Sequence, residues 1–376
     1  MFRSLTALTV VIAVAGTGSV RGDEPSFNGR KLSEWLTVLK EDETPRKRRA
    51  AVVALGQIAS ANRDSLGAVV AAIGKALRTD ASPAVRGQAA AALGLMRPEE
   101  TAAALPDLVE SMRSEKEPAV KREVAVALTR LGSVAKPAVQ PLTVSLKDSD
   151  AGVRAAAADA LGRIGPDAQA AAPELLALMK DKEKSVRRST VFALGRVDAQ
   201  DKIATATALV TVLQKDPDPD LRREALLALG FLGEHSQPVV AALAAIVTDR
   251  NADLRALAAL TLGKFGPAIR SAEPELIKAL KSDPDKDVRL NLVRTLCSAA
   301  GKDSPSLIPV LVERLKDDPA FEVRVAVAEE LGNLGEAGKT ALPSLRIAQR
   351  DPQIKVREST TAAIKSIQRQ LSKPKP

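Results

Sequence analysis

The chain has almost no aromatic residues and few of the side chains that catalytic and metal sites need. Its 376 residues include no Tyr, one Trp, six Phe, one Cys and one His. A single thiol cannot form an intrachain disulfide, so the fold must hold without one. Cys297 and His235 are the sole candidates for a nucleophile and its base, and they lie far apart in different repeats of the chain. We therefore expect no catalytic residue, no metal, no cofactor and no enzyme activity.

The chain is instead rich in small and aliphatic residues. Hydrophobic residues make up 45% of it and charged residues 27%. Because Ala, Leu and Val must fill the core in place of aromatic rings, this composition suits close and regular packing of helices. The 55 basic and 46 acidic residues give a net charge of +9, a mild excess that favours an anionic partner.

The N-terminal segment resembles a secretory signal. Arg3 is followed by an apolar or small stretch from Leu5 to Ala15, and small residues continue to Gly22. This predicts a signal peptide over residues 1–22, with cleavage between Gly16 and Asp23, and an exported protein that is periplasmic or secreted. The alternative is an uncleaved anchor, but the apolar run is shorter than the roughly 20 residues of a membrane span. We expect no integral membrane span after cleavage.

One phrase recurs along the chain at a nearly constant spacing. Asp150-Ala-Gly-Val-Arg-Ala-Ala-Ala-Ala-Asp-Ala-Leu-Gly162 is one copy, and Asn251 to Gly263 is another. After a first step of 38 residues, the basic residue of the phrase returns every 33 to 35 residues. A fixed period of this length is the signature of a repeat protein. The recurring basic residues are Arg48, Arg86, Lys121, Arg154, Arg187, Arg222, Arg255, Arg289, Arg324 and Arg357.

Each copy has the pattern of two helices. In the second helix, apolar residues stand one before and three, seven and ten after the basic residue, as in Val153, Ala157, Leu161 and Ile164, which is helical spacing. Glycines are expected to end several of these helices, and no strand-like alternation is present. The residues four positions before the basic residue are expected to cap the second helix with their side chains. They are Thr44, Ser82, Asp150, Asp218, Asn251 and Asp285.

An acidic residue stands six positions before each recurring basic residue. It is Asp in nine copies, such as Asp80 and Asp148, and Glu115 in the third. Such a residue in the turn between the helices can accept turn N–H groups and meet the basic residue one turn into the next helix. Stacking of the repeats would line these pairs into a ladder. Ten copies are too many for one active site, so we interpret them as structural.

The acidic and basic pair, followed by Ala-x-x-Ala-Leu-Gly-x-Ile-Gly, resembles the short HEAT-like repeat, also called the phycobilisome-lyase-type repeat. The resemblance covers roughly residues 30 to 370. It implies an all-α fold, a right-handed α-solenoid (superhelix) of about ten two-helix HEAT-like repeats. The solenoid would span residues 23–372, with capping first and last repeats, and residues 373–376 would form a disordered tail. Tetratricopeptide and ankyrin repeats need Tyr or His phrases that this chain lacks.

Two enzyme classes use similar repeats. Di-iron hydroxylases of this kind need several His–Glu pairs, whereas the chain has only Glu234-His235 in reversed order. Phycobilin lyases share the scaffold but have no catalytic motif that can be transferred. We interpret His235 as a surface loop residue, and Cys297, which replaces a recurring Gly, as a packed structural thiol.

One stripe of the second helices points away from the predicted core. In repeats 3 to 8 the positions one, five and nine after the basic residue include eight basic residues and one acid, Asp159. In solenoids resembling this one, the second helices line the concave surface. This predicts a binding groove with basic rims and an apolar centre, although a solvated face with incidental apolar residues is the alternative. The expected partner-binding residues are Arg188, Phe192, Arg196, Arg223, Leu227, Phe231, Leu260 and Lys264.

The function we expect is a non-enzymatic protein–protein interaction scaffold outside the cytoplasm. Its partner would be a protein bound through the concave face, and the basic residues of the stripe favour an acidic surface on that protein. The alternative is a lyase-like chaperone that holds a cofactor-bearing protein. Nucleic acid is not an expected partner, because base-stacking aromatic residues are scarce and export removes the opportunity. The oligomeric state is left open by the sequence.

Overall fold

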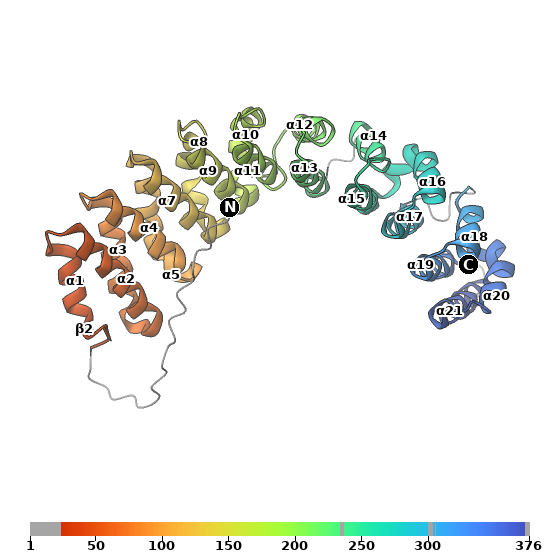
Figure 1. Ribbon diagram of the computed structural model, residues 1–376, viewed down its shortest axis with the longest axis horizontal. Coiled ribbons are helices and arrows are strands. Elements are labelled where there is room, and N and C mark those ends of the chain that lie inside the picture. The colour runs from red at the N-terminus through yellow and green to blue at the C-terminus, as the bar shows by residue number, and fades with distance from the viewer. Residues whose placement is uncertain (1–23, 234–236, 300–303, 305, 373–376) are drawn as a thin grey trace, which may run out of the picture.

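The computed structural model describes residues 24–233, 237–299, 304 and 306–372. Within them, ten helix pairs follow one another along an arch, with the first helix of each pair toward the outside and the second toward the inside (Figure 1). The all-α solenoid predicted from the sequence is confirmed. The predicted signal peptide over 1–22, the Glu234-His235 loop and the tail 373–376 lie outside the described residues.

The outer helices are the first members of the pairs. They are α1 (Leu32–Glu41), α3 (Leu66–Thr79), α6 (Leu105–Ser114), α8 (Val139–Ser145), α10 (Ala172–Leu178), α12 (Lys202–Lys215), α14 (Gln237–Ile246), α16 (Glu273–Ser282), α18 (Leu307–Asp317) and α20 (Leu342–Ala348). The inner helices are α2 (Pro45–Ala61), α4 (Pro83–Leu95), α7 (Pro118–Leu131), α9 (Ala151–Ile164), α11 (Lys184–Leu194), α13 (Pro219–Leu232), α15 (Ala252–Leu262), α17 (Lys286–Ala299), α19 (Phe321–Asn333) and α21 (Ile354–Leu371).

Short elements join the pairs. One extra α-helical turn, α5 (Pro98–Thr101), stands between α4 and α6. The 3-10 segments are η1 (Arg63–Ser65), η2 (Ala102–Ala104), η3 (Gly132–Ala138), η4 (Gly165–Ala171), η5 (Gly263–Ala272) and η7 (Gly335–Ala341). Gly165 and Gly233 follow α9 and α13 with φ of 78° and 67°, as expected of residues that end a helix.

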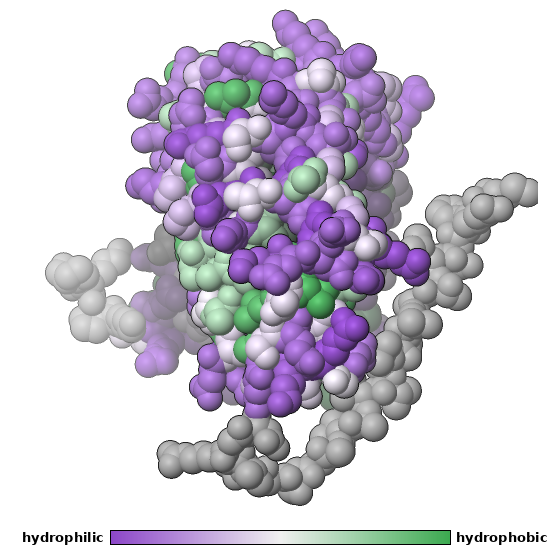
Figure 2. Space-filling model, turned by 90° about the vertical axis from the view of Figure 1, so that its left-hand side faces the viewer, coloured by the Kyte–Doolittle hydropathy of each residue, from purple (hydrophilic) through white to green (hydrophobic). Residues whose placement is uncertain are grey.

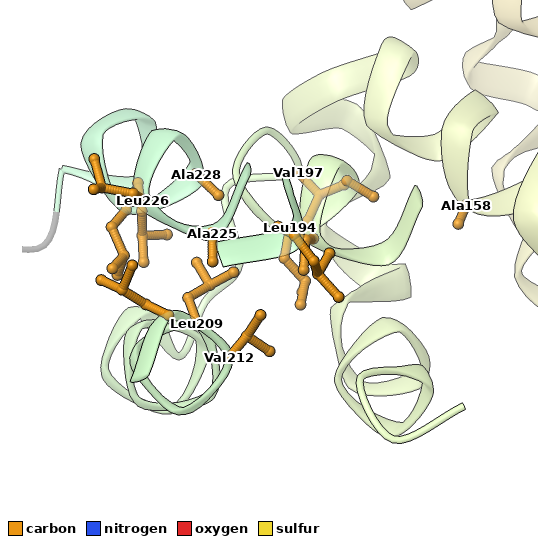
Figure 3. Close-up of a cluster of buried hydrophobic side chains, with 14 of the residues drawn as sticks. Ala158, Leu194, Val197, Leu209, Val212, Ala225, Leu226 and Ala228 are labelled. Atoms are coloured by element: carbon orange, nitrogen blue, oxygen red, sulfur yellow. The ribbon is translucent and has the colours of Figure 1, made fainter. Parts of the chain in front are cut away.

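The predicted core register of the inner helices is confirmed. In α9 the residues Val153, Ala157 and Leu161 are fully buried, and Ile164 is 2% exposed. Between repeats 5 and 6, apolar side chains from three consecutive segments point toward one another (Figure 3). These are Leu194 of α11, Val197 of the following turn, Leu209 and Val212 of α12, and Ala225 of α13.

The predicted caps are confirmed only in part. Asp150, Asp218 and Asn251 are N-cap residues whose side chains accept backbone N–H groups of the first turn, and Asp285 accepts from the N–H groups of Asp287 and Val288. Thr44 and Ser82 also occupy the N-cap position, but their side chains make no capping hydrogen bond. Expecting a side-chain cap at those two positions was therefore wrong.

Recurring glycines let neighbouring inner helices approach at backbone distance. A Cβ atom at Gly162 would lie 2.8 Å from the Cα of Ala193 in the next repeat, which is closer than carbon atoms can pack. Cys297 takes the place of this glycine in α17 and is buried. Burial first, and then the charge of Glu330, raises the pKa of the Cys297 thiol. The thiol is therefore protonated at neutral pH, as a packed structural residue would be.

The acidic and basic residues form a ladder, but between repeats rather than within one. Each basic residue except Arg357 of the last repeat pairs with the acidic residue of the following repeat, 27 to 32 positions later, whereas the sequence suggested a pair six positions apart. The predicted pairing was therefore wrong, although the predicted ladder exists. The pairs are Arg48–Asp80, Arg86–Glu115, Lys121–Asp148, Arg154–Asp181, Arg187–Asp216, Arg222–Asp249, Arg255–Asp283, Arg289–Asp318 and Arg324–Asp351.

Most arginines of the ladder bind both their own repeat and the next one, as Arg86 shows. Arg86 donates from Nε and Nη2 to the Glu115 carboxylate at 2.7 and 2.9 Å, and from Nη1 to the carbonyl oxygen of Asp80 in its own repeat at 2.9 Å. The acid also fixes its own turn, because Asp80 accepts the backbone N–H of Ser82 at 2.8 Å. One guanidinium thus joins the turn of its own repeat to the turn of the next. The ladder sets the stacking distance of the solenoid through bidentate, charge-assisted bonds.

Acid is expected to unfold this solenoid through its ladder carboxylates. Burial alone would raise the pKa of Asp80, Glu115, Asp148 and Asp181, but hydrogen bonds from the paired cation and from turn N–H groups outweigh burial and lower it. A pKa lower in the folded state means that the unfolded chain binds protons more readily. Stability should therefore be full above the ordinary carboxyl range, about pH 4, and fall as the pH drops through it.

The measurement is the urea midpoint, followed by circular dichroism between about pH 7 and about pH 3. Asp159 and Glu330 act in the opposite direction, because burial raises the pKa of each carboxyl. The ladder acids outnumber them, so the net loss should come on the acid side. A midpoint that stays constant down to about pH 3 would show that the ladder carboxylates contribute little to stability.

The N-terminal end is closed by a small β-hairpin that the sequence analysis did not predict. Strands β1 (Ser26–Phe27) and β2 (Arg30–Lys31) pair antiparallel, and the two residues between them, Asn28 and Gly29, have φ of 51° and 76°. Two left-handed residues in the order Asn-Gly make the tight turn that suits a hairpin. The Trp35 indole N–H donates to the carbonyl oxygen of Phe27 at 3.0 Å and holds the hairpin on α1.

Both ends of the solenoid carry polar side chains where internal repeats have apolar ones. Seen from the N-terminal end, the surface is mostly hydrophilic around a smaller hydrophobic area (Figure 2). In the last inner helix, Thr361 and Lys365 occupy positions that hold Ala158 and Gly162 in α9. Terminal repeats of a solenoid need such polar outer faces, because no further repeat covers them.

Candidate binding surface on the inner helices

The predicted stripe holds a row of cations and phenyl rings that alternate across four repeats. Phe192 lies in α11, and Phe231 is the second-last residue of α13. Their cationic neighbours stand at or just after the ends of inner helices, where each side chain reaches a phenyl ring of an adjacent repeat. We call these five residues the cation–aromatic row: Arg163, Phe192, Arg196, Phe231 and Lys264.

The contacts along the row are continuous. The guanidinium carbon of Arg163 lies 5.1 Å from the centroid of the Phe192 ring. The guanidinium carbon of Arg196 lies 3.8 Å from the Phe192 ring and 4.9 Å from the Phe231 ring, and the Lys264 ammonium lies 5.3 Å from Phe231. These distances are within the range of cation–π attraction. Each ring is thus flanked by two cations that belong to different repeats.

The two rings differ in how far they reach into solvent. Phe231 is 58% exposed, whereas Phe192 is half-buried. A Cβ atom at Gly162 would lie 2.8 Å from the Phe192 ring, so the glycine of the preceding repeat leaves the space in which this ring packs. Phe231 is not an isolated exposed apolar residue, because Leu260 on the same stripe is 52% exposed, and neighbouring exposed apolar residues are typical of a contact site. Phe231 is therefore the more available of the two rings.

The row carries more positive than negative charge. Burial first, and then the nearby charge of Arg163, lowers the pKa of the Arg196 guanidinium, and the charge of Glu224 offsets this only in part. The acid on the stripe is Asp159. Burial raises the pKa of its carboxyl and outweighs the hydrogen bond from Ser189 and the charges of Arg163 and Arg188, which lower it. The electrostatic field at the centre of the row therefore favours an added anion.

The remaining predicted residues flank the row. Arg188 is exposed and pairs with Glu224 of the next repeat at 3.3 Å. Leu227 is half-buried, so it contributes less surface than predicted. Arg223 is exposed and Leu260 is 52% exposed, and both line a hollow of about 580 Å³ beside the first turns of α13, α15 and α17. The structure thus brings four of the eight predicted residues into the row and places the other four around it.

The hollow has an acidic margin that the sequence analysis missed. Asp220, Asp253 and Asp287 line it, each two positions before the recurring basic residue of its repeat. The sequence analysis predicted basic rims, but the rim on this side is acidic. Carboxylates in the first turn of a helix also compensate the helix dipole, which gives these residues a structural reason to be there. The recurrence at one position was visible in the sequence and could have revealed the margin.

Within the part of the chain that the structure describes, no group of three or more His, Cys, Asp or Glu side chains is placed to hold a metal ion. Among the same residues, no helix has the length and apolar character needed to cross a membrane.

The repeats and their stacking identify the class of protein. A family model for HEAT repeats matches residues 32–129, 105–195, 206–272 and 273–365. The chain therefore belongs to the HEAT-repeat family. The match is to HEAT repeats in general, so the narrower phycobilisome-lyase type stays a prediction. No curated protein matches the chain.

Solved structures share the fold at low sequence identity. An engineered protein is 20% identical, with a TM-score of 0.58 over 90% of this chain and 98% of its own. Importin beta is 15% identical, with a TM-score of 0.58 over 90% of this chain and 53% of its own. Kap95p, in a structure with RanGDP, is 18% identical, with a TM-score of 0.57 over 89% of this chain and 49% of its own. The chain thus spans about half the length of the two natural neighbours.

Proposed function

We propose that the chain is a non-enzymatic scaffold that binds a partner protein through the concave side of its arch and acts outside the cytoplasm. The observation that carries the proposal is the cation–aromatic row on the inner helices, with Phe231 58% exposed between Arg196 and Lys264. The curvature of solenoids creates extended concave surfaces that serve for binding. Kap95, a neighbour in fold, has been solved in a complex with Nup1, so a solenoid of this kind can bind another protein.

The chemistry of the row favours a partner with an acidic surface that also carries apolar groups. Cations attract the acidic groups from a distance and speed the encounter, whereas desolvation of the phenyl rings provides most of the affinity. Arg163 and Lys264 mark the two ends of the row. A partner that lies along the row would contact repeats 4 to 7 together.

Reversing the charge at both ends of the row is expected to abolish partner capture. The test is affinity capture from the native envelope fraction with the Arg163→Glu and Lys264→Glu double variant, read out by mass spectrometry. The matched control is Lys75→Glu with Lys278→Glu, because both lysines are exposed on outer helices and the change in net charge is the same. Capture by the wild type should also weaken as salt rises.

Equal capture by both double variants would refute binding at the row. A coloured or light-absorbing cofactor that co-purifies with the captured protein would instead favour the lyase-like chaperone.

Export predicts a mature protein that starts between Gly16 and Asp23. N-terminal sequencing or intact-mass measurement of protein from the envelope fraction tests this. Such a cut leaves Glu24 in place, and its carboxylate accepts the N–H and the hydroxyl of Ser33 at the start of α1. A chain that still begins at Met1 in a membrane pellet would contradict cleavage and favour an anchor.

A further inference from the structure

The arginines of the ladder share one mode of binding. In six of them, Nη1 donates to backbone carbonyl oxygens while Nε and Nη2 together hold the two oxygens of one carboxylate. In Arg289 these distances are 2.8 Å from Nε and 2.9 Å from Nη2 to Asp318, and 2.8 Å from Nη1 to the carbonyl oxygen of Asp283. The chain thus uses the Nε–Nη2 edge as a fork for carboxylates. The six are Arg48, Arg86, Arg154, Arg255, Arg289 and Arg324.

Arg196 has the same arrangement without the carboxylate. Its Nη1 donates to the carbonyl oxygen of Phe192 at 3.0 Å, and the Phe192 and Phe231 rings stack against its guanidinium at 3.8 and 4.9 Å. Among the described residues, no acceptor lies at its Nε or Nη2. The nearest acid across the inner helices, Glu224, is paired with Arg188 at 3.3 Å.

We propose that the Nε–Nη2 edge of Arg196 is the receptor for one carboxylate of an acidic side chain on the partner protein. The inference deepens the proposed function and rests on it. The stacked rings hold the guanidinium in one plane, so its free edge is already oriented for a bidentate bond. The partner group is a carboxylate because six of the eight arginines that pair with an acid in the ladder bind an Asp or Glu through that edge.

The spacing of the row also determines which partner sequence fits. Neighbouring groups of the row lie 3.8 to 5.3 Å apart. Alternate side chains of an extended partner point to one side at intervals of about 6.6 Å, so the row from Arg163 to Lys264 corresponds to about seven partner residues. Such a segment would place acids at its first, third and seventh positions, opposite Arg163, Arg196 and Lys264, and an apolar residue at its fifth, opposite Phe231.

The test uses a synthetic peptide of that pattern, with Glu at the first, third and seventh positions, Leu at the fifth and Ser elsewhere. Its affinity is measured by fluorescence anisotropy against the wild type, Arg196→Gln and Arg196→Lys. Arg113→Gln, on outer helix α6, is the matched control. Two further peptides carry Gln or phosphoserine in place of the Glu at the third position. Circular dichroism confirms that each variant is folded.

We expect Arg196→Gln to weaken binding of the Glu peptide about tenfold, and the Gln peptide to bind the wild type about tenfold more weakly. Combined, the two changes should cost no more than either alone, because they remove the same bond. Arg196→Lys should lose most of the affinity, since an ammonium lacks the planar fork. Arg113→Gln should bind as the wild type does.

Losses of affinity that simply add would overturn the proposal, because the Glu at the third position would then not contact Arg196. A phosphoserine peptide that binds far more tightly than the Glu peptide would overturn it in favour of a phosphate receptor. If Phe231→Ala abolishes binding while Arg196→Gln changes nothing, the binding surface stands and the carboxylate receptor fails. If the wild type binds none of the peptides, the proposed surface and the receptor both fail.

Discussion

Replacing Asp318 with leucine is expected to lower the free energy of unfolding by about 3–5 kcal/mol. The Asp318 side chain is fully buried, and its partner Arg289 is 5% exposed. The substitution would leave this guanidinium buried without its carboxylate and would also remove the acceptor of the Ala320 N–H. A buried charge that loses its partner costs much more than an exposed pair contributes, because water cannot replace the lost bonds.

The adjacent residue provides the control. Asp317 precedes Asp318 and is exposed, so Asp317→Leu introduces the same leucine side chain without breaking a buried pair. Chemical unfolding followed by circular dichroism should show a large shift of the midpoint for Asp318→Leu and a small one for Asp317→Leu. Adding Arg289→Met to Asp318→Leu should recover much of the loss, since no unpaired charge remains. Equal shifts for the two leucine variants would show that the ladder does not hold repeats 8 and 9 together.

Removing both phenyl rings of the row is expected to weaken binding of the captured partner by about 2 kcal/mol or more, roughly 30-fold. The variant is Phe192→Ala with Phe231→Ala, and calorimetric titration with the partner measures its affinity. The rings would lose their contacts with the partner, and Arg196 would lose both stacking partners. Phe231→Ala alone should hardly change stability because the ring is 58% exposed, whereas Phe192→Ala should cost more because the ring is half-buried.

Two exposed apolar residues on outer helices provide the matched control for this experiment. Val144 of α8 and Ile203 of α12 are 61% and 65% exposed, and the Val144→Ala and Ile203→Ala double variant removes apolar surface away from the row. It should bind the partner as the wild type does. Unchanged affinity of the phenyl double variant would contradict binding at the row. A collapse of its thermal stability would instead show that both rings belong to the core.

The sequence by itself determined the repeats, the helix pairs and the buried positions of the inner helices. These follow from local spacing: Val153, Ala157 and Leu161 stand on one side of a helix whatever the rest of the chain does. The hairpin at Asn28-Gly29 was also encoded locally. The sequence analysis missed it because its signal is the Asn-Gly turn dipeptide rather than an alternation of apolar and polar residues.

The pairing of the ladder was decided only by the tertiary structure. Because every repeat has the same acid and the same base, a pair within one repeat and a pair between two repeats give the same periodic sequence. Arg154 could face Asp148, six positions before it, or Asp181, 27 positions after it, and only the stacking of the repeats selects Asp181. In the folded chain the nearer acid offers its backbone carbonyl oxygen to Arg154 instead of its carboxylate.

The cation–aromatic row was determined partly by the sequence and partly by the tertiary structure. Helical spacing placed Phe192, Phe231 and the cations on one stripe, so their common face followed from the sequence. Their alternation did not, because Arg196 lies beside the Phe192 ring of its own repeat and the Phe231 ring of the next. That contact depends on how closely the inner helices stack, and the glycines and the ladder set this distance through contacts between repeats.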